Sequence, residues 1–222
     1  MNHNPYALFY DIYQAHYDHA LKAIYLDAIQ THAKEGKILE MGCGPAFIGI
    51  ALAELGYDVL ATDISEDFLS QAQKNATQAG CDLAVAAHNI LDPIPFDVDH
   101  VVMGFDVINH LETLDQFDQA LRHIYAALPD GGMLFFDVLQ CDYIRTMVGH
   151  VEALTTEKGT LEWRITQGPY PCSFRHRLKR DDRVITLNQR SFAAETMTTL
   201  LSRFTWVEHL PLSDRTVYIL KK

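Results

Sequence analysis

Two glycines separated by one residue, Gly42 and Gly44, follow a run of apolar residues that begins after Lys37. Glycine lets the backbone turn sharply and lets a ligand approach the main chain, because no Cβ atom stands in the way. The run before the glycines predicts a strand over 37–42, and the residues after them predict a helix over 46–55. A strand, a glycine loop and a helix in this order are typical of a nucleotide-binding site.

The spacing of these glycines argues against a dinucleotide ligand. A site for NAD or FAD places a third glycine three residues after the second, where strand and helix pack closely. The bulky Phe47 stands at that position in this chain. NAD and FAD are therefore disfavoured.

A carboxylate follows the next predicted strand, 57–62. Asp63 lies about twenty residues after the glycine loop, the spacing at which a carboxylate can accept hydrogen bonds from both hydroxyls of a ribose. The alternative is that Asp63 caps the helix predicted over 65–79, but Ser65 can serve as that cap. We therefore predict that Asp63 binds a ribose.

The acidic-x-Gly-x-Gly form of the loop, with Glu40 ahead of the two glycines, resembles motif I of the class I S-adenosylmethionine-dependent methyltransferases. A third glycine often stands in that family where this chain has Ala46. The resemblance implies that S-adenosyl-L-methionine is the cofactor. It also implies that Glu40, Gly42, Gly44, Asp63 and Ile64 belong to its site.

The ends of the next two predicted strands extend the resemblance. After strand 83–88, the family usually has an acidic residue that accepts from the adenine amino group, followed by an apolar one; this chain has Asn89 and Ile90. An asparagine carbonyl can still accept that bond, although more weakly because it is uncharged. The alternative is an ordinary turn asparagine.

Phe105 ends strand 99–105 and Asp106 follows it, at the place where the family's main chain meets the methionine part of the cofactor and later residues face the acceptor. Asn109 and His110 come next. The unperturbed pKa of histidine, about 6.5, suits proton removal near neutral pH, so His110 is the candidate general base. The alternative is a histidine at a helix start with no chemical role.

The first 34 residues predict a helical cap before the sheet. Tyr10 and Tyr17, each followed by aspartate, resemble the tyrosine-aspartate pairs in the leading segment of related methyltransferases, which folds over the cofactor. His16 and His19 have a spacing that could hold a metal, but no third ligand is apparent, and a surface position is favoured. No metal site is predicted.

Strands and helices alternate from residue 37 to residue 138, and the strands are apolar runs, as in a sheet covered on both faces. We predict an α/β fold: a doubly wound, Rossmann-like, seven-stranded sheet. It ends in an antiparallel hairpin, 205–210 and 215–221, which follows a helix over 192–203. The whole chain, 1–222, is expected to form a single methyltransferase domain.

Residues 139–190 interrupt the alternation and predict an antiparallel β insertion after strand five, with strands over 160–166, 173–178 and 183–188. We expect this insertion to cover the acceptor pocket. The residues expected to face that pocket are Trp163, Arg164, Tyr170 and Arg175. The two arginines would suit an anionic acceptor.

The charge, the apolar runs and the cysteines of the chain indicate which partners and which location to expect. The formal net charge is −11, which would repel a nucleic-acid polymer, and the one basic cluster, 175–180, is interpreted as a solvated hairpin end. No apolar run is long enough to span a membrane. The four cysteines lie far apart without a C-x-x-C pair, so we expect no disulfide and a reducing, cytoplasmic location.

These observations predict an enzyme, an S-adenosylmethionine-dependent methyltransferase acting on a small molecule as a monomer or homodimer. Two alternatives stay open. A non-catalytic S-adenosylmethionine-binding or regulatory protein would bind the cofactor without turnover. An NAD-dependent oxidoreductase would bind the dinucleotide instead.

Overall fold

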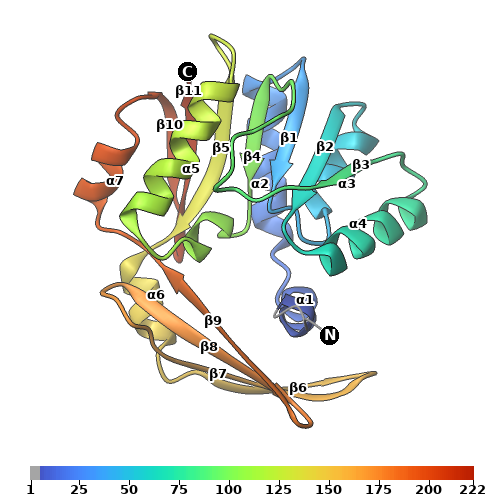
Figure 1. Ribbon diagram of the computed structural model, residues 1–222, viewed down its shortest axis with the longest axis vertical. Helices are drawn as coiled ribbons and strands as arrows, with labels where there is room; N and C mark the ends of the chain where they lie inside the picture. Colours follow the sequence, from blue (N-terminus) through green and yellow to red (C-terminus); the bar gives the residue numbers. More distant parts are fainter. Residues whose placement is uncertain (1–5) are drawn as a thin grey trace.

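The computed structural model describes residues 6–222, and Figure 1 shows their arrangement. Helices and strands alternate along the first two thirds of the chain, as the sequence predicted. The helices are α1 (Tyr6–Ala15), α2 (His19–His32), α3 (Phe47–Glu54), α4 (Glu66–Ala79), α5 (Leu114–Ala127), α6 (Cys141–Met147), α7 (Ala194–Leu200) and the 3₁₀ turn η1 (Val107–His110). The strands are β1 (Lys37–Met41), β2 (Asp58–Asp63), β3 (Ala84–Ala87), β4 (His100–Met103), β5 (Met133–Leu139), β6 (Val151–Thr156), β7 (Gly159–Gln167), β8 (Ser173–Arg180), β9 (Arg183–Arg190), β10 (Thr205–Pro211) and β11 (Arg215–Lys221).

The main sheet has seven strands in the order β10-β11-β5-β4-β1-β2-β3. The strands β1 to β5 run parallel, while β11 is antiparallel to both β5 and β10. The predicted doubly wound sheet with a terminal antiparallel hairpin is therefore confirmed. The strand order reverses between β1 and β4, and ligands of open α/β sheets bind beyond the carboxyl ends of the strands at such a point.

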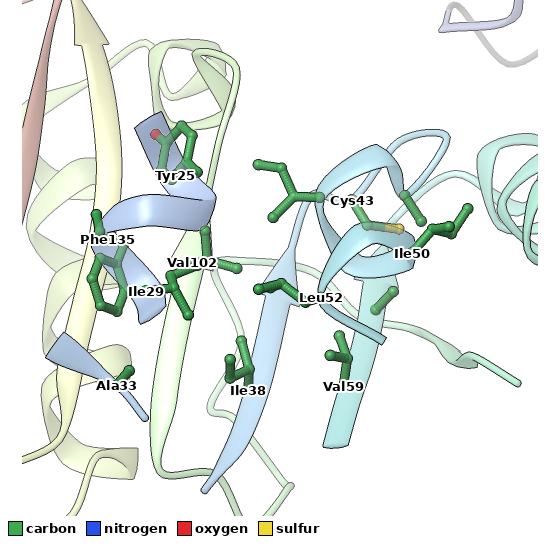
Figure 2. Packing of buried hydrophobic residues seen from close by; sticks show 14 of the residues in the cluster. Tyr25, Ile29, Ala33, Ile38, Cys43, Ile50, Leu52, Val59, Val102 and Phe135 are labelled. Carbon is green, nitrogen blue, oxygen red and sulfur yellow. The ribbon is translucent and has the colours of Figure 1, made fainter. Parts of the chain in front are cut away.

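Helices cover both faces of this sheet. On one face, α2 and α3 bury Tyr25, Ile29 and Leu52 against strand residues such as Val102 and Phe135 (Figure 2). On the other face, α5 and α7 bury an apolar stripe that includes Phe117 and Met197. None of the helices formed by residues 6–222 is long and apolar enough to cross a membrane.

The insertion forms a separate sheet of four antiparallel strands, β6-β7-β8-β9, which extends away from the main sheet (Figure 1). The sequence predicted three of these strands. It missed β6 and the helix α6, because the short segment 141–156 has no clear apolar period. A third core that contains Trp163 and Phe174 joins the four-stranded sheet to α1 and α6.

The basic cluster at 175–180 was interpreted as a solvated hairpin end, and this interpretation is wrong for Arg180. The side chain of Arg180 is buried and forms an ion pair with Asp11 of α1, which is also buried. The remaining basic side chains of the cluster are exposed or half-buried. Arg180 therefore joins the insertion to the N-terminal helices.

The expectation of unpaired cysteines is also wrong for two of the four. Cys141, at the start of α6, and Cys172, just before β8, form a disulfide with their Cα atoms 4.9 Å apart. Their separation of 31 residues hid the pairing, because only the folded insertion brings the two segments together. Cys43 and Cys81 remain thiols.

Candidate functional site

A first cavity of about 190 Å³ lies at the carboxyl ends of the parallel strands. The strands β1, β2, β3 and β4 each lead into a loop that contributes to its wall. It therefore occupies the place that the strand order predicts for a ligand. Its lining residues are Gly42, Gly44, Pro45, Asp63, Ile64, Phe68, His88, Asn89, Ile90, Phe105, Val107, His110 and Leu111.

The space around the two loop glycines differs, so a Cβ atom is disfavoured at each position on different grounds. Both have positive φ angles, 66° at Gly42 and 50° at Gly44, which residues with a Cβ adopt at a cost. A Cβ at Gly42 would stand 2.4 Å from the Val107 side chain, whereas a Cβ at Gly44 would have no atom within 4 Å. Gly42 thus allows the loop to pack on η1, and Gly44 leaves its main chain open to the cavity.

Asp63 is held in place by main-chain amides of the glycine loop and of the loop that follows β2. Its Oδ2 accepts from the Gly44 amide and its Oδ1 from the Ser65 amide, both at 2.9 Å. Burial raises the pKa of Asp63, and these amide donors oppose that rise. Ser65, not Asp63, caps α4 by accepting from the Phe68 amide. A carboxylate has about four acceptor positions, so Asp63 can still accept from a ligand.

The loop after β3 contributes Asn89 and Ile90, as predicted, and also His88. The Asn89 side-chain oxygen accepts from the Leu91 amide at 3.1 Å, so Asn89 does shape a turn. Burial lowers the pKa of His88, and its Nε2 is buried with no hydrogen-bond partner among the described residues. An unpaired buried nitrogen beside the cavity is available to a ligand.

Glu40 lies behind the glycine loop, not in the cavity wall. Its Oε2 accepts from the Gly49 amide at 3.0 Å, and a Cβ at Gly49 would stand only 2.3 Å from that oxygen. Burial raises the pKa of Glu40 to about 8. The residue thus joins β1 to α3 beneath the loop.

The chain turns sharply after β4, where Phe105 and Asp106 both have positive φ angles. The Asp106 amide donates to Asp137 of β5 at 2.9 Å, and this bond holds the turn in place. The turn directs the two side chains differently, because Phe105 lines the first cavity and Asp106 does not. Phe105 also lines a second cavity, and Asp106 lies in that one.

The second cavity, of about 150 Å³, lies between the main sheet and the insertion. Its walls come from the α1–α2 junction, from α6, and from strands of both sheets. It includes Trp163, as predicted, but most of its polar residues were not foreseen. Its lining residues are Ile12, His16, Tyr17, Asp18, Phe105, Asp106, Leu139, Tyr143, Met147, Trp163, Ile165, Phe174, His176, Gln189 and Arg215.

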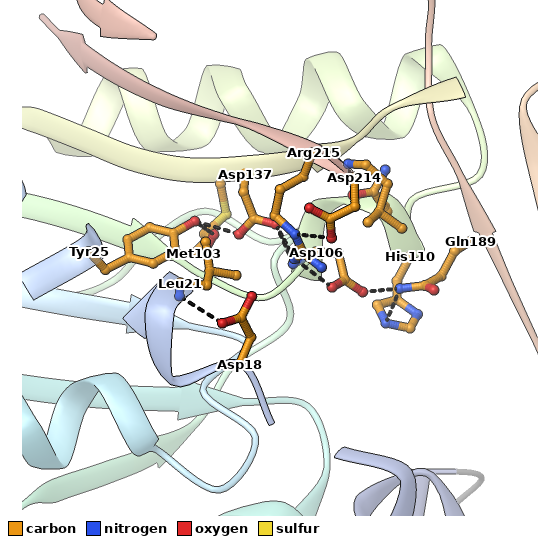
Figure 3. Close-up of polar contacts among 12 residues, drawn as sticks. Asp18, Leu21, Tyr25, Met103, Asp106, His110, Asp137, Gln189, Asp214 and Arg215 are labelled. Carbon is orange, nitrogen blue, oxygen red and sulfur yellow. Dashed lines mark hydrogen bonds and ion pairs between the residues drawn. The ribbon is translucent and has the colours of Figure 1, made fainter. Parts of the chain in front are cut away.

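One guanidinium connects several carboxylates at the base of this cavity (Figure 3). Arg215 Nη1 donates to Asp137 at 2.8 Å and to Asp106 at 3.1 Å, and its Nε donates to Asp214 at 2.8 Å. Asp137 also accepts from the hydroxyl of Tyr25 at 2.5 Å. Burial raises the pKa of both Asp106 and Asp137, and Arg215 opposes that rise.

Gln189 of β9 connects the two cavities. Its side-chain nitrogen contacts Asp106 Oδ2 and lies 3.2 Å from His110 Nε2, and its side-chain oxygen lies 2.9 Å from His176 Nε2. His110 lines the first cavity, and burial lowers its pKa to about 4. The side chain predicted as a base is therefore neutral at pH 7 and held by an amide from the insertion.

The two tyrosines predicted for the cofactor lie near the first cavity without lining it. The Tyr10 ring packs edge-on against Phe68 of the cavity wall, with 6.3 Å between centroids. Tyr17 lines the second cavity, and its ring centroid is 5.3 Å from that of Phe105. His16, expected at the surface, also borders the second cavity.

Three residues expected to face the acceptor pocket from the insertion do not. Arg164 and Arg175 are exposed, on the faces of β7 and β8 opposite Trp163 and His176, because successive side chains of a strand alternate between its faces. Tyr170 is half-buried outside the second cavity and stacks under Arg190, whose guanidinium is 4.5 Å from the ring centroid. The sequence therefore placed Arg164 and Arg175 correctly on strands but assigned their side chains to the wrong face of the sheet.

Residues 38–132 match the family model described as a methyltransferase domain. The putative methyltransferase YqeM of Bacillus subtilis is 32% identical over 107 residues, covering 47% of this chain and 43% of the relative. A ubiquinone biosynthesis O-methyltransferase of Methylococcus capsulatus is 28% identical over 142 residues, covering 59% and 57%. The chain thus spans about half the length of these curated relatives.

Solved structures share the complete fold. The crystal structure of an S-adenosylmethionine-dependent methyltransferase from Clostridium acetobutylicum has a TM-score of 0.81 and 15% identity, covering 98% of this chain and 99% of that one. The structure of S-adenosylmethionine-bound CalS10, an amino pentose methyltransferase from Micromonospora echinaspora, has a TM-score of 0.68 and 16% identity, covering 100% and 99%.

Residues 38–132 thus match a methyltransferase domain, and the sheet order and the fold of the whole chain are those of solved S-adenosylmethionine-dependent methyltransferases. The predicted resemblance is therefore confirmed, and S-adenosyl-L-methionine is the cofactor of the family. The first cavity suits that cofactor. The open main chain at Gly44, the Asp63 carboxylate and the unpaired His88 nitrogen offer it polar contacts.

Proposed function

We propose that this protein transfers a methyl group from S-adenosyl-L-methionine to a small molecule held in the second cavity. The observation that carries this proposal is that the two cavities adjoin at one side chain, Phe105. A ligand in each cavity would bring donor and acceptor together at that residue. Bound in the first cavity, the cofactor supplies a methyl group on a positively charged sulfur.

Each wall of the first cavity is assigned one part of the cofactor. Asp63 accepts from the ribose hydroxyls, with Ile64 beside the sugar. Asn89 and Ile90 contact the adenine. The main chain at Gly42 and Gly44 and the turn at Phe105 contact the methionine part, whereas Asp106, predicted for the same role, lies in the second cavity. Glu40, Tyr10 and Tyr17 support the loop and the rim from outside the cavity.

For methyl transfer, the protein contributes mainly alignment and the exclusion of water. Aromatic rings provide the exclusion here, because Tyr17, Phe105, Trp163 and Phe174 line the second cavity. The disulfide and the Arg180–Asp11 ion pair hold the insertion that carries two of these rings. Residues 139–190 therefore act as the acceptor-side insertion of a single domain.

The role of His110 as the general base stays a prediction, and burial, which lowers the pKa of His110 to about 4, weighs against it. To act as a base, its Nε2 would have to exchange the Gln189 amide for a substrate proton. In that role, His110→Ala should lower kcat by roughly a hundredfold. The pH–rate profiles of the parent and the variant decide the role. An acidic limb that persists unchanged in the alanine variant rules His110 out as the base.

Ligand binding separates this function from the two alternatives. S-adenosylhomocysteine at a hundred times its Kd should stabilise the protein by about 2.7 kcal/mol, measured as a rise in Tm, whereas NAD should give no rise. Stabilisation by NAD alone would contradict the proposal. A regulatory protein would bind S-adenosylhomocysteine equally well but would release none from S-adenosylmethionine with any acceptor.

The relatives support a small-molecule acceptor without identifying it. The matching curated relatives include ubiquinone biosynthesis O-methyltransferases, and the similar structures include the sugar N-methyltransferase KedS8. The anionic acceptor expected from Arg164 and Arg175 loses its basis, because both side chains are exposed away from the cavity.

A further inference from the structure

The charge of the second cavity is the first observation that bears on the acceptor. Asp18 and Asp106 line the cavity, and Asp137 and Asp214 bind the same guanidinium as Asp106. Among residues 6–222, four carboxylates and only one guanidinium, that of Arg215, therefore lie at this cavity. Lys22 adds one more positive charge, over the Tyr17 ring at 5.8 Å from its centroid. Together, these side chains leave an excess of negative charge at the cavity.

Hydrogen-bond directions indicate that the buried carboxylates are ionised. Asp106 receives N–H groups on both oxygens, from Gln189 and from Arg215. Asp137 likewise receives only donors, from Tyr25, Arg215 and the Asp106 amide. A carboxylate surrounded by donors is stabilised in its charged form. The negative charge is thus part of the architecture of the cavity.

The second observation is that His110 and His176, one from each cavity, already have their Nε2 atoms engaged with Gln189. The indole nitrogen of Trp163 can only donate, so His176 Nδ1 accepts from it at 3.0 Å. In the neutral ring, His176 Nε2 then carries the hydrogen and donates to the Gln189 oxygen. The Gln189 nitrogen must therefore donate to Asp106 and to His110 Nε2.

With these hydrogen-bond directions the His110 ring is neutral, and its Nε2 lone pair accepts from the Gln189 side chain. Burial lowers the pKa of His110 and that of His176 to about 4. A hydroxyl of a phenol has a pKa of about 10, and a base with a pKa of about 4 is too weak to remove its proton readily. An amine differs, because it loses a proton to water and then carries its own lone pair.

We propose that the nucleophile of the acceptor is the nitrogen of a small amine, held as a cation beside Asp106 and the aromatic wall before it reacts. This inference rests on the proposed function. Carboxylates and the faces of tyrosine and tryptophan rings attract such a cation. The amine first gives one proton to water. Its lone pair then forms a bond to the methyl carbon as the carbon–sulfur bond breaks, and the sulfur retains that electron pair. The methylated nitrogen carries the positive charge.

The test compares matched compounds with one nucleophile exchanged. The parent protein is incubated with S-adenosylmethionine and benzylamine, cyclohexylamine or D-glucosamine, each beside its hydroxyl counterpart: benzyl alcohol, cyclohexanol or D-glucose. Benzoate serves as the anionic probe. Release of S-adenosylhomocysteine is measured. We expect at least one amine to be methylated at least tenfold faster than its hydroxyl counterpart, and benzoate not to react.

Variants of the cavity carboxylates test the basis of the preference. Asp106→Asn should raise the KM for the reactive amine at least tenfold. Asp18→Asn should raise it about threefold while still capping α2, because asparagine caps helices as well as aspartate does. Asp115→Asn makes the same charge change on the exposed start of α5 and should leave the KM as it is. An equal KM in all three variants would overturn the inference.

The two proposals fail in different ways. If calorimetry detects no binding of S-adenosylhomocysteine to the parent, the proposed function itself is wrong. If S-adenosylhomocysteine binds, the amine inference is wrong on either of two results: a hydroxyl compound or benzoate reacts faster than the amines, or no amine of the panel is methylated.

Discussion

The two cavities of this protein are built from different parts of the chain and by different means. The first is made by consecutive strand ends of the main sheet, and main-chain amides position its central carboxylate. The second is assembled by side chains from seven elements and two linkers spread between Ile12 and Arg215, joined through Gln189 and Arg215. A site made of strand ends recurs wherever the sheet recurs, whereas a site made of distant side chains is particular to one sequence.

Asp63→Ala is expected to have the largest effect on ligand binding in the first cavity and none on the second. The variant loses a carboxylate placed to accept from two ribose hydroxyls, each charge-assisted bond being worth about 1.5–3 kcal/mol. Binding of S-adenosylhomocysteine should weaken at least tenfold by calorimetry while the protein remains folded. Asp182→Ala, in the exposed β8–β9 turn, is the matched control. Unchanged affinity in Asp63→Ala would mean that the cofactor site lies elsewhere.

Reduction of the Cys141–Cys172 disulfide should weaken the second region selectively. A crosslink across 31 residues contributes about 3.7 kcal/mol in the chain-entropy description. Cys141→Ser should therefore lower Tm by roughly 7 to 15 °C for a chain of this size, and S-adenosylhomocysteine should bind as before. Cys81→Ser, which removes a thiol outside the disulfide, is the control. A Tm that does not respond to Cys141→Ser would show that the crosslink does not hold the insertion.

Glu40→Gln sharpens the comparison by testing a group that supports only the first cavity. The folded pKa of about 8 exceeds the usual 4.5, so stability from this group is complete below pH 4.5 and is lost as the pH rises through 8. Glutamine keeps an acceptor for the Gly49 amide and carries no charge. The variant should gain about 1 to 3 kcal/mol relative to the parent between pH 5.5 and pH 9.

Urea unfolding at these two pH values measures that gain. Glu54→Gln, at the exposed end of α3, makes the same chemical change in water and should show no such trend. If the stability difference between Glu40→Gln and the parent were the same at both pH values, Glu40 would not be a buried acid.

The smallest effect is expected at the adenine end of the first cavity. Asn89→Leu removes an acceptor for the adenine amino group and for the Leu91 amide, so S-adenosylhomocysteine should bind about fivefold more weakly. Asn89→Asp keeps both acceptors and should bind at least as tightly as the parent. Calorimetry on the pair distinguishes a ligand contact from a turn residue. If the leucine variant and the parent had equal affinity, Asn89 would only shape the turn and would not contact the adenine.

The contrast between the cavities explains how far the sequence could predict them. Gly42, Gly44 and Asp63 lie at spacings that the strand–loop–helix unit imposes, so local patterns located them. Gln189 and Arg215 have no local signal, since their partners are brought near only by the folded sheets. The faces of Arg164 and Arg175 depended on the register of β7 and β8, and a shift of one residue reverses the face of every side chain. The disulfide escaped prediction for the same long-range reason.

The hydrogen bonds of Asn109 indicate how a protein of this fold could acquire a new acceptor. This fully buried amide accepts from Leu139 and donates to Arg190, the residues at which the chain enters and leaves the insertion. Both ends of residues 140–189 therefore meet at one anchor in η1, the Asn109 side chain. A segment whose ends meet at a point can be exchanged as a cassette without disturbing the flanking sheet. Grafting another acceptor-side cassette between Leu139 and Arg190 would change the substrate of this protein and conserve its donor site.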